Sequence, residues 1–281
     1  MKATVIGLGL IGGSIALELK VLGYTVCGVD AKDAHAHMAL DRGLVHKLAS
    51  LEASLQDAEL IVLATPVDAS LKLLPQLLDM LSENQVLIDL CSTKGSLCSA
   101  VERHARRPQY VACHPMAGTE HSGPAAAVQG LFRDRFMVIC ERERSSGFAV
   151  AYVEALFAKM EMRTVYYEAD EHDMHAAFVS HISHVSSFAL ALTVLDKEES
   201  DKAIFQLAAG GFTSTVRLAK SAPHTWVPIF RQNRNHLLEV MDAHMQKLVQ
   251  FRDALERDDA ERLESLMQRA NEIKRIIDVA L

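Results

Sequence analysis

The sequence predicts an α/β fold in two parts, a Rossmann-type doubly wound parallel sheet followed by an all-α C-terminal domain. Through the first part, short β-rich runs alternate with helical patterns, an order typical of parallel strands joined by crossover helices. From about Glu171 the strand pattern stops, and helical periodicity continues to Leu281. We therefore expect one domain over residues 1–168 and a second, helical domain over residues 169–281.

Six runs rich in β-branched and apolar residues are expected to be the strands of the sheet. Each run is three to five residues long and is followed by residues typical of a turn or a helix start. In chain order they are residues 3–6, 25–29, 60–64, 86–90, 110–112 and 136–139.

Composition limits the function classes. The 281 residues are 49% hydrophobic, enough to bury a full core, and the net charge of -7 argues against a nucleic-acid or anionic-membrane surface. The N-terminus has no cleavage-site pattern, and no run of 18 apolar residues occurs. We therefore expect a soluble, cytoplasmic protein. The five cysteines lack a Cys-x-x-Cys pair, which favours buried free thiols: Cys27, Cys91, Cys98, Cys113 and Cys140.

A glycine-rich loop follows the first expected strand and precedes a helical pattern. Gly7 permits the tight turn, Gly9 lets the backbone approach a pyrophosphate, and Gly12 allows close packing of helix against sheet. This spacing in this context predicts dinucleotide binding. The expected contact residues are Gly7, Leu8, Gly9, Leu10, Ile11 and Gly12.

An acidic residue ends the second expected strand. Asp30 can accept hydrogen bonds from the ribose hydroxyls of the adenosine, and its charge would repel a 2′-phosphate. NAD is therefore favoured over NADP, although the nearby Lys32 weakens the discrimination. Other strand ends on this side of the sheet should line the cofactor crevice, and we expect Thr65, Pro66 and Ser92 there.

His114 follows the run Tyr110 to Ala112 and is the candidate catalytic base. An imidazole at the carboxyl end of a parallel strand faces the ligand crevice, and its ordinary pKa suits proton transfer near neutrality. Oxidation of an alcohol by hydride transfer needs a group that takes the hydroxyl proton. His114 fits this role, with Ser92 as a second hydrogen-bonding group.

The helical half contains further motifs: residues 180–184 (SHISH), residues 209–217 (AGGFTSTVR) and Trp226. Together with the glycine loop and residues 113–120 (CHPMAGTE), they closely resemble the prephenate/arogenate dehydrogenase family of tyrosine biosynthesis. The resemblance extends from Gly7 to Trp226. It implies a Rossmann domain followed by a helical substrate and dimerisation domain, and an NAD(P)-dependent oxidative decarboxylation.

The resemblance also implies roles for individual residues. His114 becomes the catalytic group on the ring hydroxyl of the substrate, Ser92 its hydrogen-bonding companion, and Arg217 the binder of a carboxylate. The residues implied to face the substrate side chain or to close the pocket are His184, Ser180, His181 and Trp226. Some relatives have Pro, Lys and Gly where this chain has Ser183, Thr213 and Ala209.

Prephenate is the preferred substrate, giving 4-hydroxyphenylpyruvate, and arogenate giving tyrosine directly is the alternative. An ammonium group would need a carboxylate beside it, whereas His184 is neutral or cationic and has serines around it in sequence. Two further alternatives are a β-hydroxyacid dehydrogenase, which would have a catalytic lysine near residues 181–184, and a catalytically silent NAD-binding regulator.

Four histidines in residues 172–184 do not suggest a metal site. On one α-helix a separation of nine residues turns about 180°, so the pairs His172/His175 and His181/His184 would face opposite sides. We expect no metal, and we expect His172 and His175 to lie at a solvated helix start. A broad apolar stripe between residues 237 and 255 predicts a core or a homodimer interface.

Overall fold

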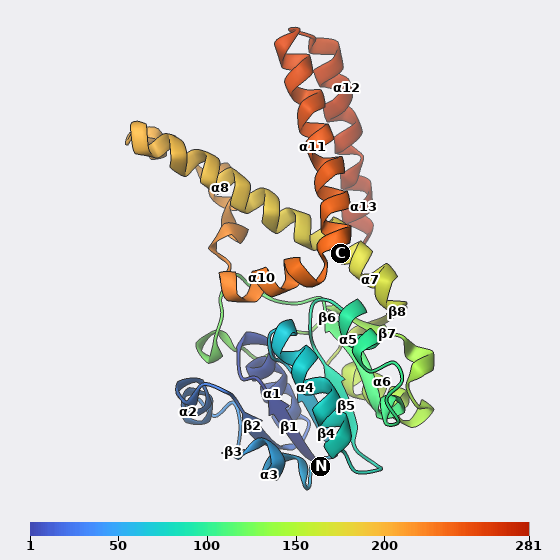
Figure 1. Cartoon of the computed structure of the whole chain (residues 1–281). Coiled ribbons are helices and arrows are strands. Elements are labelled where there is room, and N and C mark those ends of the chain that lie inside the picture. Colours follow the sequence, from blue (N-terminus) through green and yellow to red (C-terminus); the bar gives the residue numbers. More distant parts are fainter. Residues whose placement is uncertain (281) are drawn as a thin grey trace. The chain divides into compact units, whose positions relative to one another are not determined.

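The computed structural model describes residues 1–280, which form two compact units, Met1–Arg234 and Asn235–Leu281. An eight-stranded sheet in the order β3-β2-β1-β4-β5-β6-β7-β8 is the centre of the first unit (Figure 1). The strands are β1 (Lys2–Ile6), β2 (Thr25–Val29), β3 (Lys47–Leu48), β4 (Leu60–Leu63), β5 (Val86–Asp89), β6 (Tyr110–Pro115), β7 (Phe136–Cys140) and β8 (Arg163–Tyr167).

All six expected strands are present, and two strands were not predicted. β3 is only two residues long, too short to give a pattern. β8 is at the edge of the sheet and most of its side chains are only partly buried, so its sequence lacks an apolar run. Both are edge strands, where burial imposes the weakest constraint on sequence.

The pairing of β6 with β7 is antiparallel, which corrects the expectation of an all-parallel sheet. The connection between them, residues 116–135, contains a 3₁₀ turn at Pro124–Ala126 but no crossover helix, so the chain turns back. The helix α6 (Gly147–Lys159) then joins β7 to β8 in parallel. The remaining pairs in the sheet are parallel.

Helices cover both faces of the sheet and enclose two apolar cores (Figure 1). Along β4, Leu60 and Val62 enter one core while Ile61 and Leu63 enter the other, as the twofold period of a strand requires. The first core includes side chains of α1 (Leu10–Val21) and α6, and the second includes those of α3 (Leu51–Leu55), α4 (Val67–Met80) and α5 (Gly95–Ala100). The short helix α2 (Asp33–Asp41) follows β2.

After Tyr167 the described residues contain helices and turns and no strand, which confirms the expected helical half. In the first unit these are α7 (Ala169–Ala176), a π-helical turn (Ala177–His181), α8 (Ile182–Ser200), α9 (Gly210–Thr215) and α10 (Pro223–Gln232). The second unit consists of α11 (Arg234–Glu256), α12 (Ala260–Asn271) and α13 (Ile273–Ala280), with the first residue of α11 at the unit boundary. A domain boundary at residue 168 stays a prediction.

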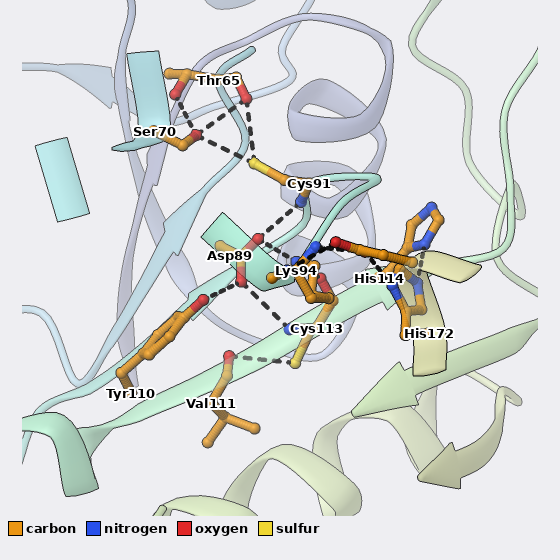
Figure 2. A network of polar contacts seen from close by, with 12 residues as sticks. Thr65, Ser70, Asp89, Cys91, Lys94, Tyr110, Val111, Cys113, His114 and His172 are labelled. Carbon is orange, nitrogen blue, oxygen red and sulfur yellow. Dashed lines mark hydrogen bonds and ion pairs between the residues drawn. The ribbon is translucent and has the colours of Figure 1, made fainter. Parts of the chain in front are cut away.

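A buried polar network ties β5 to β6 at their carboxyl ends (Figure 2). The ammonium group of Lys94 donates to the carboxylate of Asp89 and, at 2.6 Å, to the carbonyl oxygen of Cys113. The hydroxyl of Tyr110 donates to the other oxygen of Asp89 at 2.7 Å. Burial by itself lowers the pKa of Lys94, but the adjacent Asp89 carboxylate raises it above its ordinary value, so Lys94 stays charged.

Replacing Lys94 with alanine is expected to lower the free energy of unfolding by about 3–5 kcal/mol, because Asp89 would be left buried without its cation. Urea unfolding followed by circular dichroism measures this change. The matched control is Lys72→Ala on the exposed face of α4, which should stay within about 0.5 kcal/mol of the wild type. Equal stability of the two variants would contradict the structural role of the Asp89–Lys94 pair.

Candidate active site

The loop between β1 and α1 has the geometry of a phosphate cradle. Gly7 has φ +91°, and a Cβ on it would lie 2.6 Å from the carbonyl oxygen of Ala64. A Cβ on Gly12 would lie 1.8 Å from the carbonyl oxygen of Gly7, so the close approach of helix and loop requires glycine there. A Cβ on Gly9, by contrast, would meet open space. Backbone at Gly9 is therefore accessible to a bound phosphate group.

The other loop residues contribute backbone rather than side chains. The amide of Gly13 donates to the carbonyl of Gly9 at 2.8 Å as the first bond of α1, so the preceding amides of Leu10, Ile11 and Gly12 are the free donors of the helix N-terminus. Leu8 is fully buried in the core. A phosphate at this loop would be bound by main-chain N–H groups and the helix dipole.

Asp30 is fixed beside this loop at the end of β2. Its Oδ2 accepts a hydrogen bond from the amide of Leu8 at 2.8 Å, and its Oδ1 accepts one from the amide of Lys32 at 2.9 Å. The His35 ring lies 3.9 Å from Oδ1. Each carboxylate oxygen has a further lone pair that can accept from a ribose hydroxyl. The donor set around the loop therefore fits a dinucleotide.

Thr65 and Pro66 follow β4 at the same edge of the sheet. The hydroxyl of Thr65 is 2.7 Å from that of Ser70, and the Ser70 hydroxyl is 3.2 Å from the thiol of Cys91 (Figure 2). Pro66 is exposed at the start of α4. Thr65 is thus part of a hydrogen-bonded chain beneath the expected crevice, and its contact with a cofactor stays a prediction.

Strand register brings Ser92 and His114 to one edge. Asp89 pairs with Ala112 across the parallel strands β5 and β6, so Ser92 lies three residues past this pair and His114 two residues past it. Ser92 is partly exposed, while His114 is 9% exposed. Both side chains are therefore placed at the carboxyl ends of neighbouring strands, where the sequence predicted them.

His114 is held by a second histidine (Figure 2). Its Nδ1 is 2.8 Å from Nε2 of His172, and Nδ1 of His172 is 2.8 Å from Oδ1 of Asp173. His172 is 3% exposed, so the expectation of a solvated helix start was wrong for it. The prediction failed because the acidic residues around His172 suggest an exposed helix, whereas the face of α7 that carries His172 and Asp173 is buried against the strand ends. His175 is exposed and contacts the Tyr167 ring.

The surroundings of His114 keep its imidazole neutral. Burial lowers its pKa well below the ordinary 6.5, and the positive charges on His172, when protonated, and on Lys94 lower it further. No protein atom hydrogen-bonds Nε2 of His114 within the described residues 1–280. A neutral imidazole with an unoccupied nitrogen at a strand end can accept a proton from a bound hydroxyl group.

The π-helical turn between α7 and α8 rearranges the histidines of this segment. A π turn holds more residues per turn than an α-helix, so residues on either side of it are rotated relative to a straight helix. Nδ1 of His181 accepts from Nδ2 of Asn233 at 3.0 Å, and the same amide group donates to the carbonyl oxygen of Asp173 at 2.6 Å. His181 is therefore tied to α7, with its pKa lowered to about 4 by burial.

His184 and Trp226 form one wall. Their rings are stacked with centroids 3.3 Å apart, and the Trp226 ring also meets His181 edge-on. Nδ1 of His184 is 3.2 Å from the carbonyl oxygen of Ser180. Burial lowers the pKa of His184, which favours its neutral form near pH 7. The four residues expected to face a substrate side chain are thus brought together.

Arg217 is half-exposed and its guanidinium is 3.0 Å from Oε2 of Glu120. Glu120 belongs to the loop after His114, so this ion pair links the strand-end segment to the helical part of the first unit. An exposed pair of this kind contributes little stability, and its opening costs correspondingly little. Arg217 is therefore available to an incoming carboxylate. No group of three or more potential ligands that could hold a metal ion occurs among the described residues.

Sequence reasoning missed four residues of this site, namely Asp89, Lys94, Asp173 and Asn233. Three of them are charged, and charged residues are expected at the surface when the sequence alone is considered. One signal was available, because Asp89 ends an otherwise wholly apolar strand and an acidic residue buried in a sheet needs a cation. The others depend on contacts between segments 60 or more residues apart.

Comparison with known proteins assigns both halves of the chain. Residues 15–166 match the nucleotide-binding domain of prephenate dehydrogenase, and residues 168–269 match its dimerization domain. A prephenate dehydrogenase of Bacillus subtilis is 33% identical over 270 residues, which cover 94% of this chain and 73% of the relative.

Two solved structures have the same fold over nearly the whole chain. An arogenate dehydrogenase of Synechocystis is 26% identical with a TM-score of 0.79, over 99% of this chain and 100% of its own. A prephenate dehydrogenase of A. aeolicus, in complex with hydroxyphenyl propionate and NAD+, is 24% identical with a TM-score of 0.89, over 98% of each chain. At this identity the second likeness shows the fold alone.

Proposed function

The chain belongs to the prephenate dehydrogenase family, and we propose that it catalyses the NAD-dependent oxidative decarboxylation of prephenate to 4-hydroxyphenylpyruvate. The observation that carries the proposal is His114, neutral and with Nε2 free of partners among the residues that the structure describes, at the sheet edge that also holds the phosphate cradle. As an oxidoreductase of this family, the protein has a nucleotide-binding domain, which agrees with the predicted cofactor.

The reaction needs one proton acceptor from the protein. NAD, held by the glycine loop and Asp30, would supply the acceptor for the hydride of the ring carbon that carries the hydroxyl group. Nε2 of His114 takes the hydroxyl proton, the bond between the ring and its carboxylate breaks to release carbon dioxide, and its electron pair enters the ring, which becomes aromatic. The phenolate oxygen then takes a proton back from His114 to give 4-hydroxyphenylpyruvate. Ser92, at the same strand edge, supplies a second hydrogen bond to the hydroxyl oxygen.

The substrate carboxylates have one cation available in the described part of this site. Arg217 exchanges its Glu120 partner for the substrate, which replaces one charge-assisted pair with another. Ser180, His181, His184 and Trp226 form the wall toward the substrate side chain.

Prephenate suits this wall better than arogenate. The lowered pKa of His184 leaves it neutral, and the described side chains bonded to it include no carboxylate that could pair with an ammonium group. Arogenate is kept as the second candidate because the Glu120 carboxylate, which pairs with Arg217, could instead pair with an ammonium group, and because the Synechocystis relative is an arogenate dehydrogenase. Membership of the prephenate dehydrogenase family argues against a β-hydroxyacid dehydrogenase. A cytoplasmic location stays a prediction.

Purified protein is expected to form NADH from prephenate and NAD, with a larger kcat/KM than from arogenate. His114→Asn should keep NAD affinity and lower kcat by about 10²–10⁴-fold, the usual contribution of a positioned acid or base. Absorbance at 340 nm measures both, with His37→Asn on the exposed helix α2 as the matched control. A His114→Asn variant within threefold of the wild-type kcat would contradict the assignment.

The cofactor preference is expected to depend on Asp30. Asp30→Ala removes an acceptor for the ribose hydroxyls and a charge that repels a 2′-phosphate, so it should weaken NAD more than NADP. Binding of each cofactor by calorimetry gives the ratio. Asp33→Ala, three residues further along the chain on α2, is the control. An unchanged ratio of NAD to NADP affinity in Asp30→Ala would show that Asp30 does not bind the ribose hydroxyls.

We also propose that the protein is a homodimer, because residues 168–269 match a dimerization domain and the helical parts expose large apolar side chains. By length and composition alone, the helical stretch Ala169–Ser200 could cross a membrane, yet only 17% of its apolar window is buried within the chain. A second copy would cover such a surface. The exposed apolar residues include Leu192 and Leu195 on α8, and Met245, Leu248 and Val249 on α11.

Light scattering at micromolar concentration should give twice the chain mass of 30.9 kDa. Leu192→Glu is expected to shift the protein toward the monomer, because a charge would have to be buried in the interface. Glu198→Gln on the same helix is the control. A wild-type protein that is monomeric under these conditions would refute the proposal.

A further inference from the structure

We infer that His172 and Asp173 are positioning residues, which fix the ring nitrogen of His114 that carries hydrogen and share the proton that His114 removes from the substrate. The inference rests on the proposed function, because it assigns two more residues to the same site. The hydrogen bonds that run from His114 through His172 to Asp173 carry it. Figure 2 shows the contact between the two histidines.

Asp173 determines which atom donates in each hydrogen bond of this series. Its Oδ1 accepts from the backbone amide of Lys94 at 2.7 Å, and its Oδ2 accepts from that of Gly95 at 2.8 Å. Burial alone would raise the pKa of Asp173, but the hydrogen bonds from His172 and from these two amides hold it below its ordinary value. An ionised carboxylate can only accept, so Nδ1 of His172, 2.8 Å from Oδ1, must carry the hydrogen.

The hydrogen positions on the two histidine rings follow from the hydrogen bond between His172 and Asp173. In a neutral His172 with hydrogen on Nδ1, Nε2 has a lone pair and can only accept. This nitrogen is 2.8 Å from Nδ1 of His114, so Nδ1 of His114 must donate. The lone pair of His114 is then on Nε2, the nitrogen without a protein partner among the described residues. That lone pair is the one a proton acceptor needs.

The charges around His114 favour its neutral form before reaction. Lys94 and His181 are basic groups that act on His114 besides His172, and a proton on His114 would repel them. Within the buried cluster Lys94 is paired with Asp89, which leaves Asp173 as the carboxylate without a cation. A proton that reaches His172 therefore comes to rest beside an ionised carboxylate.

Proton uptake during the reaction uses this carboxylate. The substrate hydroxyl gives its proton to Nε2 of His114, and the hydrogen on Nδ1 of His114 can move to Nε2 of His172. His114 is then neutral with its hydrogen on Nε2, and His172 is an imidazolium against ionised Asp173, with one proton gained in total. The charge rests beside a carboxylate instead of on a ring that faces Lys94.

The tautomer of His114 in the wild-type protein gives the first test, and it needs no variant that must fold. Protein labelled with ¹⁵N in its histidine rings is observed by NMR at about pH 8, and the His114 signals are assigned by their loss in His114→Gln. We expect hydrogen on Nδ1 and none on Nε2. Hydrogen on Nε2 of His114, or a doubly protonated His172, would overturn the inference.

The second test separates positioning from packing. His172→Phe keeps a planar ring but removes the acceptor for His114, and it should lower kcat at least 10²-fold while the KM for prephenate and the affinity for NAD change less than threefold. His172→Gln retains an amide oxygen that can accept from Nδ1 of His114, so its kcat should be at least tenfold higher than that of His172→Phe. His175→Phe, an exposed histidine on the same helix, should leave kcat within twofold.

Equal kcat values for His172→Phe and the wild type, or no recovery in a folded His172→Gln, would overturn the inference. The two levels of proposal fail in different ways. If the wild-type protein oxidises neither prephenate nor arogenate, the proposed function fails, while the NMR tautomer of His114 still decides the arrangement of the hydrogen bonds.

Discussion

The site depends on one buried lysine. The ammonium group of Lys94 joins the Asp89 carboxylate at the end of β5 to the Cys113 carbonyl on β6, and its backbone amide donates to Asp173 on α7. A single residue thus connects three segments that are distant in sequence. Because Lys94 and Asp89 are wholly removed from water, each is costly without the other, and the pair enforces one alignment of the two strand ends. His114 directly follows the carbonyl group that Lys94 binds.

Desolvation sets the chemistry of the histidines in this region. Burial is the first cause of the lowered pKa of His114, His181 and His184. A lowered pKa keeps each ring neutral near pH 7, where a neutral imidazole can accept a proton and a cationic one cannot. Asp173 remains ionised in the same surroundings because two backbone amides and His172 donate to it. Neutral histidine rings beside the ionised Asp173 carboxylate allow the site to accept one proton.

The sequence was sufficient for the features that follow from local pattern. The glycine loop, Asp30 and the strand before His114 each have a signal within a few residues, and the structure places them at one edge of the sheet. The antiparallel turn to β7 was not predicted, because its cause is the absence of a crossover helix over 20 irregular residues rather than any strand pattern. Edge strand β8 carries too little buried surface to be recognised.

The contacts of His172, Asp173 and Asn233 were beyond sequence reasoning for a different reason. The sequence neighbours of His172 and Asp173 are polar and acidic, which is typical of an exposed helix, and those of Asn233 are polar or basic. The burial of all three results from contacts with segments more than 50 residues away. The π turn that aligns His181 with α7 has no distinct sequence signal either. Such contacts are non-local, so a periodicity argument, which places residues on the faces of one ideal helix, cannot find them.

The central claim is that a neutral His114 accepts the substrate proton, and the pH dependence of kcat/KM for prephenate tests it most directly. Because burial lowers the pKa of His114 below its ordinary 6.5, the free enzyme should hold the active, neutral form down to mildly acidic pH. The account predicts that kcat/KM rises with pH through an ionisation below about pH 6.5 and is level above it, and that His114→Asn abolishes this limb. An acidic limb centred above about pH 7, or one unchanged in His114→Asn, would contradict it.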